Sequence, residues 1–338
     1  GEGVFFDYFF FSENCSYHLL SILEVGKPEL NLTDAFWSTV NPVDTVRTVM
    51  ASPNLVTDIK YRPSTYHEMK FREELLEASE RELLKEVIFA KADFLVPRFQ
   101  LIAESRKEKM LRSFMDYYFY RKIKLDKKRI EEELTEEERK ELDRLTELHK
   151  MALKELSAIG QLSGDEIPIP PRPDEGHDSS KLALASGISS RSHYSSFTIR
   201  PTFHDLVANE SGYLKNSQIE MLTTELRYYL PEQKLKLHEF KLVDAISLSP
   251  LTQIQKNVSW RLKFNWGTET DPECFYCNHI NFNYGNGLTL SSKLLREETY
   301  FLLLEITSQV NWTRSEIFLL GPCLFGGCLL KPHERLHI

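Results

Sequence analysis

The chain has little of several features that mark particular classes of protein. Its 338 residues include five cysteines, which are too few for a disulfide scaffold and too scattered for a zinc ribbon. A basic excess is missing, because the net charge is -8, and we therefore expect no nucleic acid partner. No stretch approaches the roughly 20 apolar residues of a transmembrane helix. Phosphate-cradling glycine loops and the HExxH and GxSxG motifs are also absent, so we predict no metal and no cofactor.

An initial methionine and a signal peptide are missing too. The chain begins at Gly1 and runs at once into the aromatic stretch Val4–Phe11. We predict a strand there, and a strand this apolar needs neighbours on both faces. We therefore expect a fragment whose N-terminal part is absent, and the lack of a targeting segment gives no information about location.

The residues that are present divide the chain into three regions. With 41% hydrophobic and 27% charged residues the chain can form packed cores, and its length predicts two or three domains. Residues 1–66 mix aromatic and turn residues, residues 67–164 are rich in Glu, Lys, Arg and Leu, and residues 165–338 hold most alternating apolar patterns. We predict an α+β fold with a domain in each region.

In the first region, helical apolar spacing follows directly after Asn14, whose side chain can cap a helix N-terminus. The helix is expected to end at Gly26, and Cys15 then lies in its first turn. A second short helix is predicted over Pro42–Met50, with Asn41 as its cap.

The middle region is predicted to be helical. Thr135–Glu138 has the pattern of a capping box, an apolar stripe follows over Leu142–Leu156, and Gly160 ends the helix. Glu73–Ile88 behaves similarly, and the two segments together predict a helical hairpin with solvated outer faces. A partner-binding coiled coil is the alternative, but no heptad pattern persists for several repeats.

The last region follows the proline-rich linker Ile167–Pro173, which favours an extended chain. Its apolar residues then alternate with period two, which is typical of strands. The clearest strand patterns are Val258–Trp266, Ile280–Tyr284, after which Gly285–Gly287 is expected to turn, and Tyr300–Ile306.

Over Leu235–Leu242 the alternation changes phase, which predicts a β-bulge near His238. Several strands joined by turns predict an antiparallel sheet that is closed or nearly so, and therefore barrel-like. Its aromatic residues are either a girdle that faces lipid or part of the core, and the core is favoured. These residues are Trp260, Trp266, Tyr284 and Tyr300.

The sharpest chemical feature is the pair Asn14–Cys15 at the start of the first helix. The partial positive charge of a helix N-terminus stabilises an anion, and the thiolate is the nucleophilic form of cysteine. Cys15 is therefore a candidate nucleophile. The alternative is a buried cysteine that acts as a small hydrophobic residue.

Three histidines are candidate general bases. His18 lies one helical turn from Cys15, but its side chain is expected to point along the helix. In His177-Asp178 and His204-Asp205 a carboxylate follows the histidine and would orient the ring in a triad-like way. Adjacent strand residues point to opposite faces, so hydrogen bonding in a loop or at a sheet end is the alternative for both pairs.

The pair Cys274–Cys277 is a CxxC motif without a second pair. Zinc is therefore not expected, and a redox site of thioredoxin type would need a βαβ context. A local disulfide and two unpaired thiols both remain open.

Six segments, in this order, resemble the bacterial Lnb N-terminal periplasmic domain family. They touch most of the chain except the helical middle. The segments are Phe6–Glu24, Pro42–Arg47, Tyr61–Ser64, Gly176–Ser180, Arg200–Leu206 and Leu242–Pro250.

The resemblance implies a Gram-negative envelope protein of the periplasm, associated with the inner or outer membrane surface. It implies an acyltransferase that moves a fatty acyl chain from a phospholipid donor to the N-terminus of a lipoprotein acceptor. Asn14–Cys15 is also similar to the motif of permuted papain-like acyltransferases of the lecithin–retinol type, which implies a thioester on Cys15 and a partial papain-like domain over residues 1–66. In those enzymes the base is a histidine on an upstream strand. No histidine precedes Cys15 here, so the base is expected upstream of Gly1 or at His177 or His204.

Two further functions remain open. A papain-like site would also suit an envelope hydrolase that cuts peptidoglycan peptides or lipids. A non-catalytic protein is the other alternative, with a β-domain that binds lipid or lies in the outer membrane and a helical arm that recruits partners.

Overall fold

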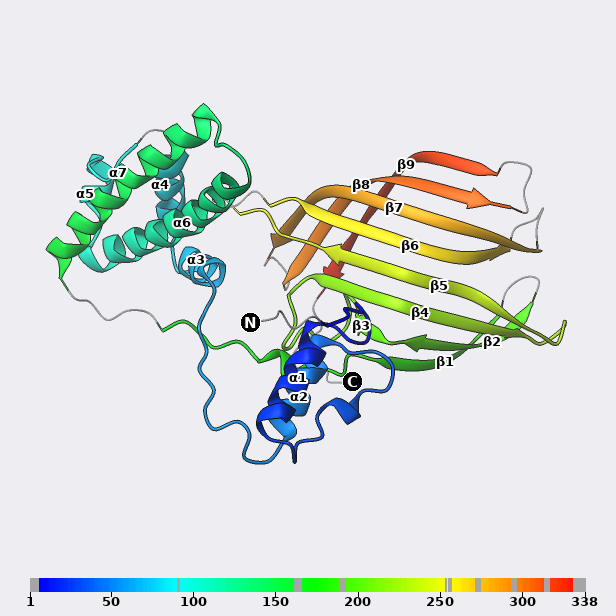
Figure 1. Ribbon diagram of the computed structural model, residues 1–338. Coiled ribbons are helices and arrows are strands. Elements are labelled where there is room, and N and C mark those ends of the chain that lie inside the picture. The colour runs from blue at the N-terminus through cyan, green and yellow to red at the C-terminus, as the bar shows by residue number, and fades with distance from the viewer. Residues whose placement is uncertain are drawn as a thin grey trace. The chain divides into compact units, whose positions relative to one another are not determined.

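The computed structural model shows the chain as two compact units (Figure 1). One unit comprises residues 1–59, 170–251 and 257–338, and the other comprises residues 60–169 and 252–256. The structure describes residues 6–89, 92–160, 166–188, 192–252, 254, 257–270, 275–292, 297–312 and 317–330. Helices and an antiparallel sheet are both present, which confirms the α+β class.

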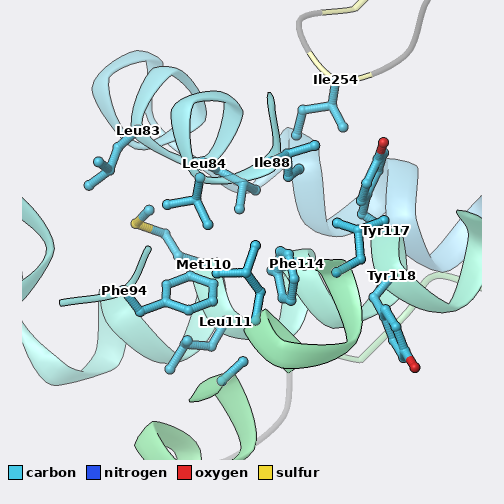
Figure 2. Packing of buried hydrophobic residues seen from close by; sticks show 14 of the residues in the cluster. Leu83, Leu84, Ile88, Phe94, Met110, Leu111, Phe114, Tyr117, Tyr118 and Ile254 are labelled. Carbon is cyan, nitrogen blue, oxygen red and sulfur yellow. The ribbon is translucent and has the colours of Figure 1, made fainter. Parts of the chain in front are cut away.

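The helical unit surrounds an apolar core (Figure 2). Leu84, Phe94 and Phe114 are each 0% exposed, and Ile254 joins them from the short segment that returns to this unit. The helices are α3 (Thr65–Glu74), α4 (Ala78–Phe89), α5 (Pro97–Gln100), α6 (Glu104–Glu131) and α7 (Glu136–Ile159).

Helix α7 matches its prediction. The capping box of Thr135 and Glu138 is present, Leu145 and Leu148 are buried, and Gly160 follows the last turn with φ +82°. The predicted hairpin differs in its main partner, because α7 packs mainly beside α6 (Figure 1). Arg144 of α7 also donates to the backbone oxygens of Val87 and Ile88 in α4.

The segment Glu73–Ile88 is divided between two helices rather than forming one. The Glu80 carboxylate accepts the Glu77 backbone N–H at 2.7 Å, just before α4 begins. A side chain therefore satisfies a backbone donor that a continuous helix would have bonded internally.

The sheet is an antiparallel meander in the order β1-β2-β4-β5-β6-β7-β8-β9, with the short β3 beside β4. Among the described strands, β1 and β9 each pair with one neighbour, so the sheet is open. The sequence had predicted a sheet that is closed or nearly closed. The strands are β1 (Lys181–Ile188), β2 (His193–Arg200), β3 (Thr202–His204), β4 (Ser217–Tyr229), β5 (Lys234–Ser247), β6 (Ser259–Thr270), β7 (Phe275–Ser292), β8 (Glu298–Asn311) and β9 (Phe318–Leu330).

The bulge near His238 is confirmed, because Leu237 and Glu239 face the consecutive residues Leu226 and Glu225. The turn predicted at Gly285–Gly287 is wrong, since β7 continues through it. A Cβ on Gly287 would lie 2.0 Å from the backbone oxygen of Leu302. These glycines therefore let β8 approach closely instead of turning the chain.

The predicted core position of the sheet aromatics is wrong for three of the four. Trp260, Tyr284 and Tyr300 are 39%, 46% and 47% exposed, and Trp266 is half-buried. The opposite face of the sheet buries charged side chains such as Glu305 of β8 and Asp244 of the neighbouring β5. Because neighbouring strand residues alternate between faces, the aromatic face is turned outward.

The N-terminal part of the first unit contains α1 (Cys15–Gly26) and α2 (Pro42–Ala51), close to their predicted ranges. The strand expected over Val4–Phe11 is not found in its described part, which begins at residue 6. Phe9 and Ser12 form local turn hydrogen bonds in place of a strand ladder. No helix in the described ranges combines the length and the hydropathy of a membrane span.

Candidate functional site

Asn14 holds the start of α1 in place. Its side-chain oxygen accepts the backbone N–H groups of Ser16 and Tyr17 at 3.1 and 3.3 Å, which is an N-cap. Its side-chain nitrogen donates to the backbone oxygens of Phe10 at 3.3 Å and Val40 at 2.8 Å. Asn14 is buried, and its polar atoms are used in these bonds, so the residue positions the helix start.

Cys15 is the first residue of α1, and its thiol is free and exposed. The exposed position excludes the alternative in which this cysteine is part of a packed core. Because Asn14 takes the N–H groups of Ser16 and Tyr17, the Cys15 N–H is the donor of this first turn that has no acceptor among the described residues. An exposed thiol therefore lies beside an unpaired backbone donor.

His18 is held by the segment that precedes the helix. Its Nε2 lies 3.1 Å from the backbone oxygen of Asp7, and its ring packs against Phe6 at 4.8 Å. Among the described residues, no hydrogen bond joins the His18 ring to Cys15.

The structure brings His177 and His204 together. His177 Nε2 lies 2.9 Å from His204 Nδ1. Both rings stack on Tyr213, with centroid distances of 4.3 and 4.2 Å. Tyr213 also donates its hydroxyl to the His177 backbone oxygen at 2.9 Å. Two histidines selected separately from sequence thus form one cluster around a tyrosine that the sequence pattern did not indicate.

The hydrogen bonds define the tautomers of this pair. His177 Nδ1 lies 2.7 Å from the backbone oxygen of Asp178, which can only accept, so Nδ1 carries a proton. In the neutral ring Nε2 is then an acceptor, and His204 must donate to it from Nδ1. His204 Nε2 is left without a proton, and this buried atom has no hydrogen-bond partner among the described residues.

The environment of His204 favours the neutral ring. Burial lowers the pKa of His204, and the neighbouring His177 lowers it further, while Asp205 and Glu210 oppose the shift. Its side chain is 1% exposed. His204 therefore presents an unprotonated nitrogen in a site from which water is largely excluded.

Neither aspartate orients the histidine that precedes it. The Asp205 carboxylate accepts the Val207 N–H at 3.1 Å and lies 3.5 Å from Arg200. His177 bonds the backbone oxygen of Asp178 rather than its carboxylate. The triad-like arrangement considered for these two pairs is therefore not formed.

Arg47 of α2 anchors the loop that carries His177. Its guanidinium donates to the backbone oxygens of Asp174, Gly176 and His177 at 3.2, 3.3 and 2.7 Å. It also pairs with Asp44 at 2.7 Å. This role was not predicted, although the i,i+3 spacing of Asp44 and Arg47 on one helix face was a usable signal.

Asn41 extends this network to the strand that carries His204. Its side chain donates to Ser179 Oγ at 3.0 Å and to the Pro201 backbone oxygen at 3.1 Å, and it accepts from Thr202 Oγ1 at 2.9 Å. Asn41 is the N-cap residue of α2, as predicted, but its side chain makes no cap hydrogen bond. It links α2 to the loop and to β3 instead.

A short covalent connection links this network to the start of α1. Asn14 bonds the backbone oxygen of Val40, and Asn41 is the next residue along the chain. Within the described ranges, however, no hydrogen bond joins the Cys15 thiol to His177 or His204. One network thus positions the nucleophile candidate and the histidine pair, with no hydrogen bond between them among the described residues.

Among the described residues, the remaining cysteines and the acidic side chains form no metal centre. In the described part of the chain, no group of three or more His, Cys, Asp or Glu side chains could hold a metal ion. Cys277 is disulfide-bonded, and Cys274 lies outside the described residues.

Comparison with known proteins identifies two segments. The model of the Lnb N-terminal periplasmic domain matches residues 2–52, which confirms the resemblance and supports a periplasmic location. No curated protein and no solved structure matches the chain. A model described as "Domain of unknown function (DUF7840)" matches residues 170–338, which is half of the chain. The chain thus belongs to the DUF7840 family and carries, ahead of that domain, a segment of the Lnb N-terminal periplasmic domain family.

Proposed function

We propose that this chain belongs to a periplasmic acyltransferase in which Cys15 carries a fatty acyl group as a thioester. The observation that supports this proposal is the free, exposed thiol at the first position of α1, inside the segment matched by the Lnb model. A capped helix that begins at a cysteine is the arrangement expected for part of a papain-like domain. A phospholipid at the membrane surface is the donor, and a lipoprotein α-amine is the acceptor.

The reaction has two halves. A base removes the proton of the Cys15 thiol, the thiolate attacks the carbonyl carbon of a phospholipid ester, and a C–S bond forms. The ester C–O bond breaks, and the leaving lysophospholipid oxygen takes the proton from the base. The α-amine then attacks the thioester, a C–N bond forms, and the C–S bond breaks to return the thiol. The unpaired N–H of Cys15 lies beside the sulfur and can donate to the oxyanion in both halves.

The proton acceptor is a separate part of the proposal. His204 is the candidate base that offers an unprotonated nitrogen, and His177 holds its tautomer through the 2.9 Å hydrogen bond. A general base must lie within hydrogen-bonding distance of the proton that it removes when the substrate is bound. We therefore treat the roles of His204 and His177 as a hypothesis to be tested apart from that of Cys15.

The test uses a phospholipid with an isotope-labelled acyl chain, followed by a diacylated lipopeptide with a free α-amine. We expect mass spectrometry to find a hydroxylamine-sensitive acyl adduct on Cys15 and then the labelled chain on the lipopeptide. Cys15→Ala should abolish both signals, whereas Cys328→Ala, which removes another exposed free thiol, should leave them unchanged. Equal adduct and transfer in Cys15→Ala would disprove the proposal.

The same experiment separates a transferase from a hydrolase. A hydrolase releases labelled free fatty acid at the same rate with and without the amine acceptor, whereas a transferase needs the amine to resolve the thioester. His204→Gln tests the base, because the acyl adduct should then form more slowly at neutral pH and recover as the pH is raised.

A further inference from the structure

One face of strands β6–β9 is largely apolar over the central part of the strands. We call the even-numbered residues 260–266, 280–290, 300–310 and 318–330 the apolar face. Strands β6 to β9 lie side by side in the sheet (Figure 1). Their registers pair even-numbered residues with even-numbered residues over these ranges, so these side chains lie on one continuous face. No Asp, Glu, Lys, Arg or His occurs among them.

These side chains are turned toward the outside of the sheet. Leu302, Leu304 and Ile306 of β8 are 57%, 61% and 61% exposed, whereas Leu303 and Glu305 between them are 0% and 1% exposed. Adjacent strands continue the pattern with further exposed apolar residues: Phe282, Leu288, Leu290, Phe318, Leu320, Leu324 and Leu330. Contiguous apolar patches on monomeric soluble proteins rarely exceed a few hundred Å², so this face is expected to have a neighbour.

The opposite face holds the polar groups of the same strands. Arg261 lies 3.3 Å from Asp244 and 3.5 Å from Glu305, and Asn283 donates to Thr307 at 2.7 Å. Arg261 and Asn283 are thus paired on this side, where Leu303, Phe301, Phe325 and Leu329 also form a small apolar cluster. The exposed apolar face reverses the usual order of a sheet in water, where the apolar face is buried, and matches sheets whose outward face meets lipid.

The length of the apolar face suits a bilayer. From Tyr300 to Val310 a strand at about 3.3 Å per residue covers about 33 Å, against a hydrocarbon core of about 30 Å. Tyr300 lies at one end of this stretch, and Trp266 lies at the other, on the row of Val310 and Ile280. Tyr and Trp are the residues enriched where hydrocarbon meets the head groups.

The face also offers little to a protein partner. Protein interfaces contain about one hydrogen bond per 100–200 Å². The amide of Asn286 and the hydroxyl of Tyr284 bond each other at 3.3 Å, which leaves few free polar groups. Hydrocarbon needs no hydrogen bonds, so its chemistry fits this surface.

We propose that the apolar face lies against the acyl-chain region of a lipid bilayer. The surface is formed by the sheet alone and does not include Cys15 or the histidine pair, so this inference is independent of the acyl-transfer reaction. Contact with the bilayer would bring the chain to the phase that contains its proposed phospholipid donor.

The test is flotation of the full chain with vesicles of phosphatidylethanolamine and phosphatidylglycerol at a 3:1 ratio. We expect the protein to float with the vesicles, and the paired substitution Leu302→Asp/Leu304→Asp to lower the partition coefficient at least tenfold. The control is Leu214→Asp, which adds the same charge at a leucine that is 80% exposed outside the apolar face. Far-UV circular dichroism must show the same strand content in all three proteins.

A second measurement locates the contact. Vesicles with brominated acyl chains should quench the tryptophan fluorescence, and Trp260→Phe/Trp266→Phe should remove most of that quenching, whereas Trp37→Phe should not. Equal flotation of the Asp variant and the parent would overturn the proposal. A second result would also overturn the proposal: no vesicle binding, together with a stable dimer that dissociates in Leu304→Asp. The apolar face would then be covered by a second copy of the chain.

Discussion

His177 Nε2 and His204 Nδ1 lie 2.9 Å apart, and both rings rest on the face of Tyr213. Since the Asp178 backbone oxygen requires a proton on His177 Nδ1, a neutral His177 accepts at Nε2 from His204 Nδ1, and a neutral His204 then carries no proton on Nε2. A proton added to His204 would place a charge in a buried position beside a second imidazole. The stability of the folded protein is therefore expected to fall when His204 is protonated at acid pH.

The unfolding temperature should fall as the pH drops below about 6.5, the usual pKa of histidine. Burial lowers the pKa of His204 in the folded state, so the unfolded chain binds a proton first and acidification favours unfolding. His204→Gln keeps a donor for His177 but cannot titrate, and it should flatten this part of the profile. The measurement is differential scanning calorimetry of both proteins between about pH 5 and about pH 8.

His149 of the helical unit is the matched control, because burial lowers its pKa as well. His149→Gln should change the acid sensitivity of the helical unit and leave the transition of the sheet unit unchanged. If His204→Gln shows the same pH dependence as the parent protein, the buried neutral pair does not cause the acid sensitivity.

Gly176→Ala should displace the loop that carries His177. A Cβ at this position would lie 2.6 Å from the Ser211 backbone oxygen and 2.8 Å from Cε2 of Tyr213, so the loop or the tyrosine must move. We expect a loss of about 2 kcal/mol in the free energy of unfolding, typical of overpacking. Gly26→Ala is the control, because a Cβ there meets nothing within 4 Å. A chemical denaturation series in which both variants match the parent would contradict the predicted steric contact.

Asn14→Ala should cost more than the loss of an ordinary N-cap. The substitution removes the cap of α1, a buried bond to the backbone oxygen of Val40 and a partly buried bond to that of Phe10. We expect about 2–3 kcal/mol, against about 1 kcal/mol for Ser64→Ala, which removes a single cap bond to His67 in α3. Urea unfolding measures both, and equal losses would show that the bond to Val40 contributes little.

Local signals predicted much of this structure, and long-range contacts explain the differences. The capping box at Thr135 and the bulge at His238 depend on neighbouring residues, so sequence alone was sufficient. Asn41 has the local pattern of a cap, but Ser179 and Thr202, far along the chain, offer its amide better partners. The exposed aromatics of the sheet were assigned to the core because alternation shows that two faces differ, not which face is enclosed.

In the candidate site, too, local signals were predictable from sequence and long-range contacts were not. Cys15 and its helix follow from a local cap, whereas the contact between His177 and His204 joins segments 27 positions apart. Tyr213, on which both rings stack, has no neighbouring pattern that would have selected it. Only the tertiary structure shows that these three rings form one cluster.

Arg47→Ala should release the His177 loop without unfolding α2. The substitution removes three charge-assisted bonds to backbone oxygens of the loop, while Asp44 keeps Ser179 Oγ as a donor. We expect a loss of about 2 kcal/mol and faster amide exchange over residues 174–179, measured by hydrogen–deuterium exchange mass spectrometry. Arg47→Lys is the informative control, because lysine keeps the charge beside Asp44 but lacks the planar fork that reaches several acceptors at once. If exchange rises in Arg47→Ala and recovers only partly in Arg47→Lys, the planar guanidinium holds the loop. If Arg47→Lys restores full protection, the ion pair with Asp44 is sufficient, and the three bonds to backbone oxygens do not hold His177 against Tyr213.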